Sequence, residues 1–481
     1  MNRFADVKNR LPDIKINFAE WYQEVIYQAE LVDQSPVRGS MVVRPYGCAL
    51  WEQMVKILDA RFKATGHENA LFPLFIPESF LKKEADHVAG FAPELAVVTH
   101  AGGKELEEPL VVRPTSETII HYMFARWIKS WRNLPLKINQ WANVVRWELR
   151  PRPFLRTTEF YWQEGHTAHA TLQEAKEEAE LILAEYVAFA HDYLAIPVIT
   201  GQKTDSEKFP GAEKTLTFEG IMQDGKALQM GTSHMLSQSF CHAFDMKFQD
   251  KDGNLSVPYL TSWGVTTRLV GAVVMTHGDQ KGLVLPPFIA PIQIVIIPIY
   301  KTGQDNAALQ TVIQKLKADL TQKNMRVFVD DSEHQTPGAK FYTWELKGVP
   351  IRIEIGSRDI VANQLTIVTR YNGEKIAISL EGCVESIEKL LQTIHQNMFT
   401  AAKQKINALI KTNNSLVEFG PIMDAQQGVY KTSWCGNATC EAQVKEYKGT
   451  VRCVLPGDLL FNTCFVCAEK ANHNIVVAKA Y

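Results

Sequence analysis

Four arginines and two glutamates crowd one short stretch of the chain, RWELRPRPFLRTTEF, which runs from Arg146 to Phe160. Arginine presents a rigid fork of hydrogen-bond donors that suits phosphate oxygens, and glutamate accepts from an amine such as that of adenine. Apolar residues flank the stretch on both sides, so we expect a turn between two strands here. Three functions fit such a turn: a solvated hairpin tip, a patch for nucleic acid, or a site that grips a polyphosphate.

The residues around this turn alternate in a way that predicts a shared face. VVRWEL is typical of a strand, in which Arg146 and Glu148, two residues apart, project from the same side. The next run, FYWQEGH, predicts a second strand whose same-side residues are Trp162, Glu164 and His166. Two adjacent strands would then line one pocket. On this pattern alone, a salt-bridged hairpin in solvent explains the charges equally well.

The cysteines are concentrated near the end of the chain, where CGNATC is followed at a distance by CFVC. Two close pairs with enough chain between them to fold back are typical of a metal site, and four thiolates surround zinc tetrahedrally. We therefore expect a structural zinc held by Cys435, Cys440, Cys464 and Cys467. Reduced cysteines in a small core are the alternative, and Cys453 and His473 are spare ligands. Nothing indicates the open fourth position that a catalytic zinc requires.

Composition sets the outer limits. The chain has 481 residues, 46% of them hydrophobic and 22% charged, which predicts two or three domains with full cores. It has no apolar stretch of about 18 residues and its first residues lack the apolar centre of a secretory signal, so we expect cytoplasmic residence without membrane insertion. A formal net charge of -2 gives no global attraction to nucleic acid, so any polyanion partner must bind through local patches.

The distribution of apolar residues predicts three regions, which we place at residues 1–285, 286–400 and 401–481. In the first, short runs rich in valine and aromatics alternate with amphipathic helices, as in an antiparallel sheet with helices packed against it. The second follows LVLPPFIAPIQ, whose three prolines suggest a hinge, and alternates strands with helices as a small parallel or mixed α/β domain does. A long helix, from about Ser386 to Lys411, precedes the cysteine-rich tail. The predicted fold class is α+β.

Several motifs occur in an order that resembles the catalytic domain of class II aminoacyl-tRNA synthetases. More narrowly, the order resembles the prolyl-tRNA synthetase family of the archaeal and eukaryotic type. TGHENALFPLF resembles the first class motif, which forms dimers, while IAPIQIVIIPI and the cysteine pairs resemble the family's anticodon-binding and zinc-binding domains. The resemblance therefore covers essentially the whole chain. The motifs that carry it in the catalytic part are TSE at 115–117, RWE at 146–148, FLRTTEF and WQEGH within 154–166, QMGTSH at 229–234 and SWGVTTR at 262–268.

The resemblance implies activation of L-proline by ATP, with Mg²⁺, to prolyl-adenylate, and transfer to the 3′ end of tRNA(Pro) with release of AMP and pyrophosphate. It implies Arg146 and Arg268 as catalytic residues, on the α- and γ-phosphates. The implied ATP site is Arg146, Glu148, Arg156, Thr157, Gln229, Thr232, Thr266 and Arg268. The implied proline site is Thr115, Glu117, Arg146, Trp162, Glu164, His166, Phe209, His234 and Ser262. A carboxylate such as Glu117 suits the amine of proline, and Trp162 with Phe209 suits its ring.

Each of these positions also has an explanation without a ligand. PTSET begins a predicted helix, where Thr or Ser caps the first turn and Glu favours the positive end of the dipole. His166 and His234 fit hydrogen-bonded core histidines, Phe209 fits ordinary packing, and Arg268 fits a pair with any nearby carboxylate. Only the joint occurrence of the motifs in family order favours the functional interpretation.

The resemblance has further implications. It implies a homodimer, and no editing domain, because too little chain separates WQEGH from GVTTR for the large insertion of bacterial-type relatives. It also directs the carboxylate of Tyr481 toward the active site. In the middle domain, Arg352 and Glu354 share a strand face and either read the anticodon or form an edge-strand ion pair. A threonyl or seryl synthetase and a non-catalytic paralogue are the rival functions. Threonyl enzymes hold a zinc in the amino-acid pocket, but no Cys and His set appears among these motifs; non-catalytic paralogues usually lose the ATP arginines, and both arginines are present here.

Overall fold

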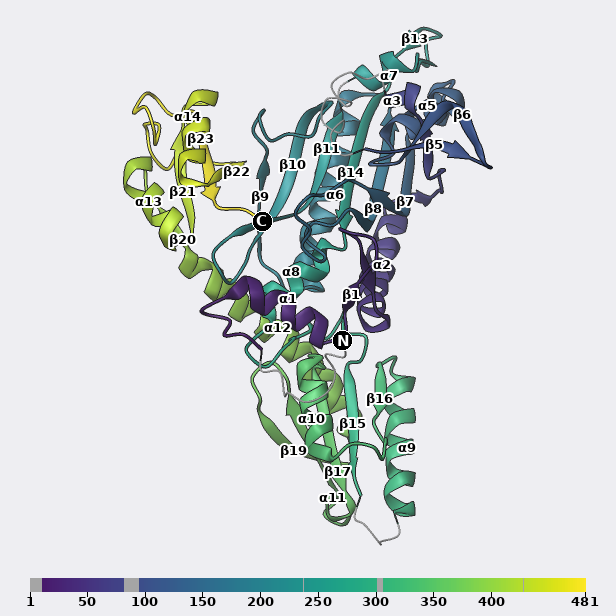
Figure 1. Cartoon of the computed structure of the whole chain (residues 1–481), viewed down its shortest axis with the longest axis vertical. Helices are drawn as coiled ribbons and strands as arrows, with labels where there is room; N and C mark the ends of the chain where they lie inside the picture. Colours follow the sequence, from purple (N-terminus) through teal and green to yellow (C-terminus); the bar gives the residue numbers. More distant parts are fainter. Residues whose placement is uncertain (1–10, 82–94, 237, 301–305, 427) are drawn as a thin grey trace.

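The computed structural model places the three parts of the chain around one long sheet (Figure 1). The N-terminal region lies above, a region with a mixed sheet extends downward, and the C-terminal region lies beside the edge of the upper sheet. Within the described residues, no helix is both long enough and apolar enough to cross a membrane. The structure describes residues 11–81, 95–236, 238–300, 306–426 and 428–481.

Within these residues an 11-stranded sheet crosses the upper part of the molecule. Its strands are β3 (Glu68–Asn69), β7 (Leu136–Val145), β8 (Glu159–His169), β9 (Val198–Gln202), β10 (Ala212–Ile221), β11 (Ala227–Leu236), β14 (Tyr259–Thr266), β20 (Ile410–Thr412), β21 (Val429–Trp434), β22 (Thr450–Leu455) and β23 (His473–Ala478). Their spatial order is β20-β21-β23-β22-β9-β10-β11-β14-β8-β7-β3. From β9 to β7 all neighbours are antiparallel, which confirms the predicted antiparallel sheet.

One long helix covers the back of this sheet, and its sequence explains why. α6 (Leu172–Asp192) begins with a capping box, in which Thr171 Oγ1 accepts from the Glu174 backbone N–H and the Glu174 carboxylate accepts from the Thr171 N–H. Its buried face, which includes Ile182, Tyr186 and Phe189, packs against β10, β11 and β14. These side chains belong to a core cluster shared with the sheet. The helix thereby holds the strands that carry the candidate site.

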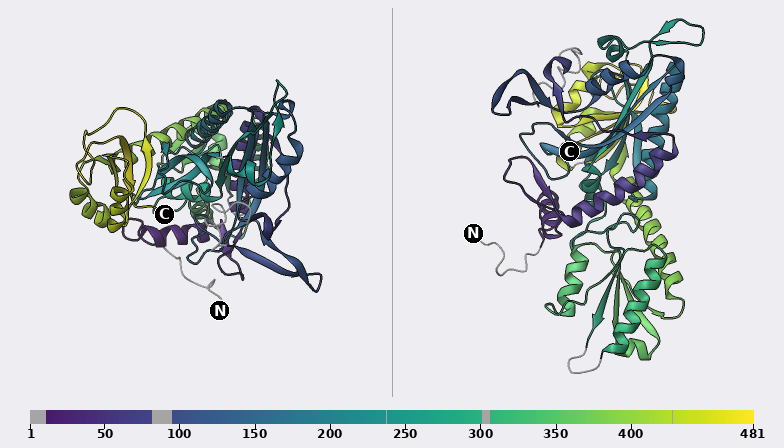
Figure 2. Two further views of the ribbon diagram at one scale, coloured as in Figure 1. Left: turned by 90° about the horizontal axis from the view of Figure 1, so that it is seen from above. Right: turned by 90° about the vertical axis from the view of Figure 1, so that its right-hand side faces the viewer.

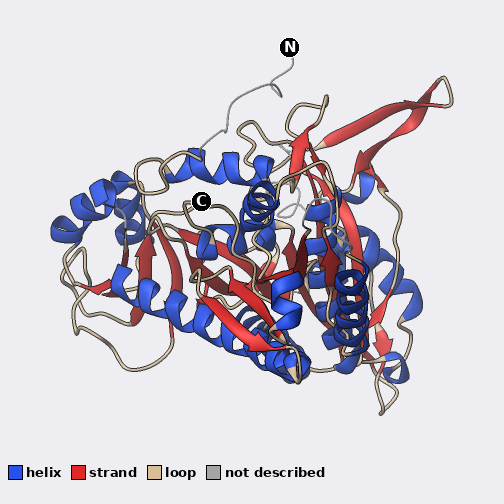
Figure 3. Cartoon of the chain, turned by 90° about the horizontal axis from the view of Figure 1, so that it is seen from below, coloured by secondary structure: helices blue, strands red, loops and turns tan. Residues whose placement is uncertain are grey.

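Shorter elements surround the sheet. β5 and β6 form a hairpin that extends away from the body (Figures 2 and 3). The other elements of the N-terminal region are α1 (Phe18–Gln28), β1 (Val32–Gln34), β2 (Met41–Val43), α2 (Pro45–Ala64), β4 (Phe75–Pro77), α3 (Glu78–Leu81), β5 (Ala96–Ala101), β6 (Lys104–Val112), α5 (Glu117–Trp127), the 3-10 helix η2 (Trp131–Asn133), α7 (Ser239–Ala243), β12 (Phe248–Gln249), β13 (Leu255–Ser256) and α8 (Arg268–His277).

The mixed-sheet region, residues 294–399, has its own core. It contains β15 (Ile294–Ile299), α9 (Ala307–Gln322), β16 (Val327–Val329), α10 (Pro337–Leu346), β17 (Ile351–Gly356), α11 (Ser357–Val361), β18 (Gln364–Thr369), β19 (Lys375–Ser379) and the first part of α12 (Cys383–Leu409). β16, β15 and β17 are parallel, and β18 and β19 add antiparallel pairs. Ile387, Leu391 and Ile394 recur at helical spacing on α12 and are buried in this core. The predicted mixed α/β domain and long helix are thus confirmed.

The C-terminal region, residues 410–481, continues the main sheet instead of forming a separate one. Its helical elements are α13 (Leu416–Gln426), α14 (Ala438–Gln443) and the 3-10 helix η3 (Val444–Tyr447). β22 pairs with β9 of the N-terminal region, where Val454 lies opposite Gln202. The view from above shows the yellow C-terminal strands beside the teal strands of the main sheet (Figure 2).

The three-proline segment that suggested a hinge is a packed connection between α8 and β15. Leu283, Leu285 and Ile289 are fully buried in the core of the N-terminal region. The Leu283 and Leu285 backbone N–H groups donate to the carbonyls of Leu346 and Gly348. Burial and these hydrogen bonds tie the segment to α10 and the turn after it.

Candidate active site and cysteine cluster

The candidate site is built from rows of side chains that cross neighbouring strands. Opposite residues of an antiparallel ladder project from the same face, so the register decides which side chains meet. His166 on β8 lies opposite Ser262 on β14, which lies opposite His234 on β11. A second row joins Glu164, Gly264 and Thr232. Residues far apart in the chain therefore share one floor.

Gly264, in the second row, leaves this part of the pocket floor without a side chain. A Cβ on Gly264 would lie 3.0 Å from the Gln163 carbonyl oxygen and 3.7 Å from the Trp162 ring. The first of these distances is tighter than ordinary van der Waals contact. A side chain here would crowd the backbone of β8 beneath the pocket.

A pocket of about 550 Å³ lies over these rows. All of the side chains that the resemblance implied for ATP and proline line it. They are Thr115, Glu117, Arg146, Glu148, Arg156, Thr157, Trp162, Glu164, His166, Phe209, Gln229, Thr232, His234, Ser262, Thr266 and Arg268. The structure therefore brings the predicted residues together; their individual roles stay predictions.

The charged stretch that raised the first question divides into two parts. Arg146, Glu148 and Arg156 line the pocket, whereas Arg150 and Arg152 do not. The predicted strand through Glu148 is wrong in its last residues, because β7 ends at Val145. The Arg146 N–H still donates to the Thr158 carbonyl at 2.8 Å, which holds the chain beside its partner past the strand end. A simple solvated hairpin tip does not describe this arrangement.

Two arginines are fixed within the pocket by the protein itself. Arg146 Nε donates to the Pro114 carbonyl at 2.9 Å, and its guanidinium lies 5.4 Å from the Trp162 ring centre. Arg268 Nε and Nη1 donate to the carbonyls of Leu155 and Gln229, each at 3.1 Å. Burial, together with the charges of Arg156 and Arg146, lowers the pKa of Arg268 to about 10. It therefore stays positively charged at neutral pH and needs an anion.

Glu164 lies at the bottom of the pocket and is held by donors from three sides. Its Oε1 accepts from Ser116 Oγ at 2.5 Å and from Gln140 Nε2 at 2.8 Å, and its Oε2 lies 3.1 Å from His166 Nε2. Burial alone would raise the pKa of Glu164, but these hydrogen bonds and the charge of His166 outweigh it and hold the pKa below the usual value. The carboxylate is therefore a fixed negative charge.

Sequence reasoning missed the two residues that orient Glu164, Ser116 and Gln140. Ser116 occupies the N-cap of α5, yet its side chain makes no cap hydrogen bond, so the alternative explanation of a capping serine does not hold. Gln140 lies opposite Glu164 on β7. The cross-strand register was the signal for Gln140, and it depends on a strand pairing that the sequence did not specify residue by residue.

His234 is a neutral wall of the pocket. Burial, aided by the charge of His166, lowers its pKa to about 3. Both ring nitrogens have hydroxyl neighbours, Thr215 Oγ1 at 2.9 Å and Thr232 Oγ1 at 3.0 Å. The Phe209 ring stacks on it with ring centres 4.6 Å apart. The stacked pair offers a flat apolar surface to a small ring.

Some buried polar atoms of the pocket find no hydrogen-bond partner within the described part of the chain. They include Trp162 Nε1, His166 Nδ1 and Ser262 Oγ. A buried polar atom without a partner costs stability, so such atoms mark positions where a ligand gains hydrogen bonds. The pocket is therefore suited to a polar ligand as well as to a ring.

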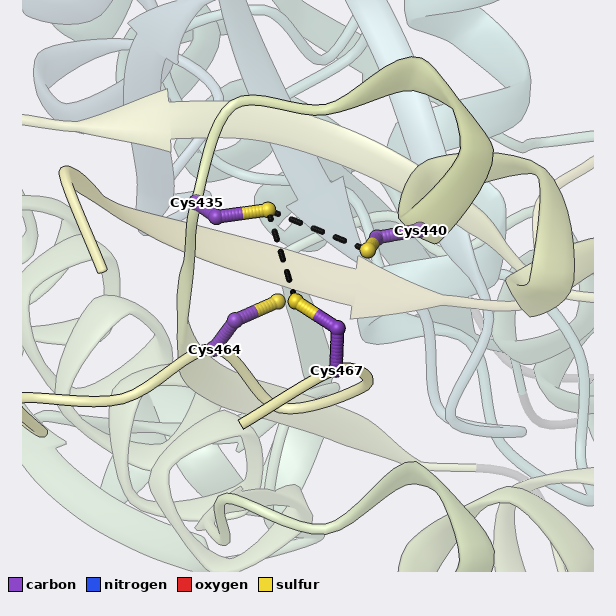
Figure 4. A group of neighbouring side chains, drawn as sticks. All are labelled: Cys435, Cys440, Cys464 and Cys467. Carbon is purple, nitrogen blue, oxygen red and sulfur yellow. Dashed lines mark hydrogen bonds between the residues drawn. The ribbon is translucent and has the colours of Figure 1, made fainter. Parts of the chain in front are cut away.

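The cysteine pairs meet as predicted (Figure 4). The sulfur atoms of Cys435, Cys440, Cys464 and Cys467 all lie within 4.8 Å of one another. Cys435 Sγ is 3.8 Å from Cys440 Sγ and 3.9 Å from Cys467 Sγ. Zinc bonds of about 2.3 Å in a tetrahedron place sulfurs about 3.8 Å apart, so the set fits zinc. The spare residues Cys453 and His473 are not part of the group.

Three further residues named from the sequence lie outside the pocket lining. Tyr481 donates its hydroxyl to Asp224 Oδ2 at 2.7 Å and its backbone N–H to the Ala227 carbonyl at 3.1 Å. Arg352 donates from two nitrogens to Glu354, and the pair lies on β17 in the middle of its sheet. The ion pair is therefore present, but not on an edge strand.

Comparison with known proteins assigns each part of the chain. The model of the family "tRNA synthetase class II core domain (G, H, P, S and T)" matches residues 98–277. The models "Anticodon binding domain" and "Prolyl-tRNA synthetase, C-terminal" match residues 293–390 and 416–481.

Full-length relatives agree with these matches. The chain is 51% identical to proline–tRNA ligase 2 of Clostridioides difficile (strain 630) over 467 residues, which cover 97% of this chain and 96% of the relative. It is 50% identical to proline–tRNA ligase of Alkaliphilus oremlandii (strain OhILAs) over 472 residues, 97% of each chain.

Solved structures are similar over the same span. Prolyl-tRNA synthetase from Cryptosporidium parvum complexed with halofuginone and AMPPNP superposes with a TM-score of 0.93 at 39% identity, over 98% of this chain and 99% of that one. The same enzyme complexed with L-proline and AMP gives 0.91 at 38%, with the same coverage. With the pocket, the cysteine cluster and these full-length likenesses together, the chain belongs to the proline–tRNA ligase family of class II aminoacyl-tRNA synthetases.

Proposed function

We propose that the chain activates L-proline with ATP and transfers it to the 3′ end of tRNA(Pro), releasing AMP and pyrophosphate. The observation that carries this proposal is the single pocket in which residues of all the catalytic motifs meet. It contains fixed cations for phosphates, a neutral aromatic pair for a ring, and buried carboxylates for an amine. The relatives named above are proline–tRNA ligases, and the Cryptosporidium parvum enzyme was crystallised with L-proline and AMP.

Activation is a displacement at the α-phosphate. The proline carboxylate is already ionised near pH 7, so its attack needs no general base. Catalysis then consists of positioning and of stabilising charge on the transferring group. Arg146 holds the α-phosphate, and Arg268 keeps the leaving pyrophosphate bound. ATP enters as its Mg²⁺ complex, in which the metal neutralises part of the phosphate charge.

The nucleotide lies between the strands and the turn after β7. Glu148 accepts from the adenine amine and is paired loosely with Arg156, whose Nε is 3.7 Å from its Oε2. Arg156 and Thr157 contact the nucleotide from the turn, and Gln229, Thr232 and Thr266 contact it from β11 and β14. These roles use polar groups that already line the pocket.

Proline occupies the part of the pocket beneath the phosphates. Thr115 and Glu117 meet its amine, and Thr115 Oγ1 already donates to Glu117 Oε2 at 2.5 Å, which orients that carboxylate. Trp162, Phe209 and His234 enclose the ring, while His166 and Ser262 supply the hydrogen-bonding atoms noted above. Glu164 anchors this end of the pocket. Proline is larger than alanine by only about two methylene groups, so the pocket discriminates weakly between them. We therefore expect misactivation of alanine.

The rest of the chain supports tRNA charging. Residues 286–400 bind the anticodon. Residues 401–481 hold a structural zinc through the cysteine cluster, and residues 1–285 form the catalytic domain and a homodimer with a second copy. The protein is of the archaeal and eukaryotic type and lacks an editing domain; the described residues between β8 and β14 form only α6, α7 and strands β9 to β13. The reaction takes place in the cytoplasm, where tRNA is charged for translation.

The test is ATP–pyrophosphate exchange by the purified protein with each amino acid in turn. We expect strong exchange with proline, weak exchange with alanine, and none with threonine or serine. Exchange with threonine or serine would instead identify the rival synthetases, and no exchange at all would identify a non-catalytic paralogue.

Two variants connect the activity to the pocket. Arg146→Ala and Arg268→Ala should each lower the exchange rate by about 10² to 10³, as loss of a transition-state donor does. Arg150→Ala, from the same charged stretch but outside the pocket lining, is the control and should retain exchange.

A further inference from the structure

A buried ion triad joins the C-terminal region to the catalytic sheet. Lys203 follows β9, Glu219 lies on β10, and Arg452 lies on β22. Their side chains are 1%, 1% and 7% exposed. Charges are rarely buried this deeply unless they are paired, so the arrangement calls for a physical reason.

The triad is fully connected by hydrogen bonds. Glu219 Oε1 accepts from Lys203 Nζ at 2.7 Å, and its Oε2 accepts from Arg452 Nη2 at 2.9 Å and Nε at 3.2 Å. Lys203 Nζ also donates to the Arg452 carbonyl at 2.8 Å. Burial alone would raise the pKa of Glu219, but the charges of Arg452 and Lys203 outweigh it and hold the pKa below the usual value. Glu219 is therefore ionised.

Irregularities in the strand pairing set the direction of these side chains. On β22, Val451 and Cys453 lie opposite adjacent residues of β23, so Arg452 is the extra residue of a β-bulge. A second bulge in β11 makes Gln229 the partner of Glu219 on β10. Bulges redirect a side chain from the normal alternation. Both irregularities occur where the triad meets the catalytic sheet.

The triad reaches the nucleotide end of the pocket in two short steps. Glu219 is the ladder partner of Gln229, and the Gln229 carbonyl accepts from Arg268 Nη1 at 3.1 Å. Glu219 also accepts from Thr217 Oγ1 at 3.0 Å, and Thr217 lies opposite the pocket residue Thr232. One guanidinium from the C-terminal region thus holds the carboxylate beside the residues that we assign to ATP.

The charges are arranged for a polyanion. Arg146, Arg156 and Arg268 line the pocket, and burial together with their mutual repulsion lowers the pKa of Arg268, while Glu219 acts in the opposite direction. The triad itself contains two cations and one carboxylate, which leaves one positive charge in excess beside the pocket. Within the protein, such charges act at longer range than in water.

We propose that Arg452 of the C-terminal region is a positioning residue for the nucleotide site, acting through Glu219 on Gln229 and Arg268. The C-terminal region then helps to position the ATP site in addition to its structural role. This inference rests on the proposed function, because it assumes that the pocket binds ATP.

The experiment is ATP–pyrophosphate exchange with full-length Arg452→Met, measured against ATP at saturating proline and against proline at saturating ATP. We expect the KM for ATP to rise about tenfold and the KM for proline to change by less than about twofold. A merely structural role would alter both constants together or neither. An equal change in both, or no change in the KM for ATP, would overturn the proposal.

Arg370→Met is the matched control. Arg370 is also a buried arginine, 4% exposed, that donates to a carboxylate of the N-terminal region, Asp279, at 2.6 and 2.7 Å. Asp279 does not line the pocket. Loss of Arg370 should therefore leave both KM values within about twofold of the wild type. A rise in the KM for ATP in both variants would show that any lost buried arginine has this effect, which also overturns the proposal.

Arg452→Lys keeps the test valid if Arg452→Met does not fold. Lysine keeps the charge but lacks the fork that contacts Glu219 twice. We expect a rise of about threefold in the KM for ATP at unchanged KM for proline, and an unchanged KM for ATP would refute the role of the fork. If the wild-type protein showed no proline-dependent exchange, the proposed function itself would fail, which is a different result from normal exchange that Arg452 does not influence.

Discussion

The two regions that follow the catalytic sheet join it in different ways. The C-terminal region adds its strands to the sheet, beside β9, and places Arg452 against the buried Glu219. The mixed-sheet region keeps its own sheet and is joined to the N-terminal region by side-chain contacts, such as Arg370 with Asp279, and by the backbone hydrogen bonds of Leu283 and Leu285. Strands of one continued sheet are held in fixed positions, whereas two separate sheets joined by fewer contacts have more freedom to shift.

This difference suits two tasks. Anticodon binding requires a region that reaches a distant part of tRNA, and a separate sheet serves it. A site that aligns phosphates requires atoms held within a fraction of an ångström. If the comparison is correct, damage to the junction with the C-terminal region should raise the KM for ATP. Damage to the junction with the mixed-sheet region should not.

The largest effect is expected from the cysteine cluster. Cys464→Ser should abolish zinc binding, measured as metal per chain, and lower the stability of the C-terminal region by several kcal/mol, because structural zinc contributes about 10 kcal/mol or more to folding in small domains. Since β22 belongs to this region, we also expect exchange activity to fall. Cys383→Ser, at a buried cysteine of the mixed-sheet region, should retain metal and activity. A variant without zinc that retains full exchange would break the comparison.

Removing the lysine of the triad should be next in size. Lys203→Met leaves Glu219 with one cation, and loss of a partner from a buried pair costs about 3 to 5 kcal/mol, which urea unfolding measures. Lys340→Met is the control in the mixed-sheet region, where a lysine 5% exposed lies 3.3 Å from Asp330. Both variants should be destabilised, but only Lys203→Met should raise the KM for ATP. The comparison is weakened if Lys340→Met does so as well.

Breaking a contact at the junction with the mixed-sheet region should cost less stability. Arg370→Met removes a bidentate contact, but the Asp279 side chain is 43% exposed, so solvent lowers the cost to about 2 kcal/mol. We expect a small fall in melting temperature, slower charging of tRNA because the two regions are less firmly aligned, and unchanged ATP–pyrophosphate exchange. Equal losses in both reactions would show that this junction also positions ATP.

The smallest effect is a loss of stability in acid, and it comes from histidines at the junction of α12 with the N-terminal region. Burial lowers the pKa of His277 to about 4, despite its hydrogen bond to the Leu194 carbonyl, and His395 and Lys405 lower it further. A histidine with a lowered folded pKa contributes full stability above its unfolded pKa of about 6.5 and loses it as pH falls toward 4. From pH 7 to 5.5 this amounts to about 1.2 kcal/mol.

His277→Gln should therefore reduce the fall in melting temperature between pH 7 and pH 5.5. Glutamine keeps a donor for the Leu194 carbonyl and does not titrate. An identical pH dependence in wild type and variant would rule out His277 as the source. The triad at the C-terminal junction has no histidine and should not respond in this range.

Local patterns were predicted well because their causes are local. The apolar face of α6 lies within one segment, and α12 was placed within a few residues of its observed bounds. The spacing of the cysteine pairs likewise identified the cluster that Figure 4 shows. The end of β7 was misjudged, because Arg146 continues the backbone hydrogen bonding without the regular strand pairing.

By itself the sequence determined which residue types the site contains and, through motif order, which family they belong to. Only the tertiary structure decided which partners hold them: Gln140 for Glu164, and Arg452, 233 positions along the chain, for Glu219. The physical reason is that strand register and β-bulges depend on the whole sheet. A spacing of a few residues determines what a turn or helix brings together, but not which distant strand becomes its neighbour.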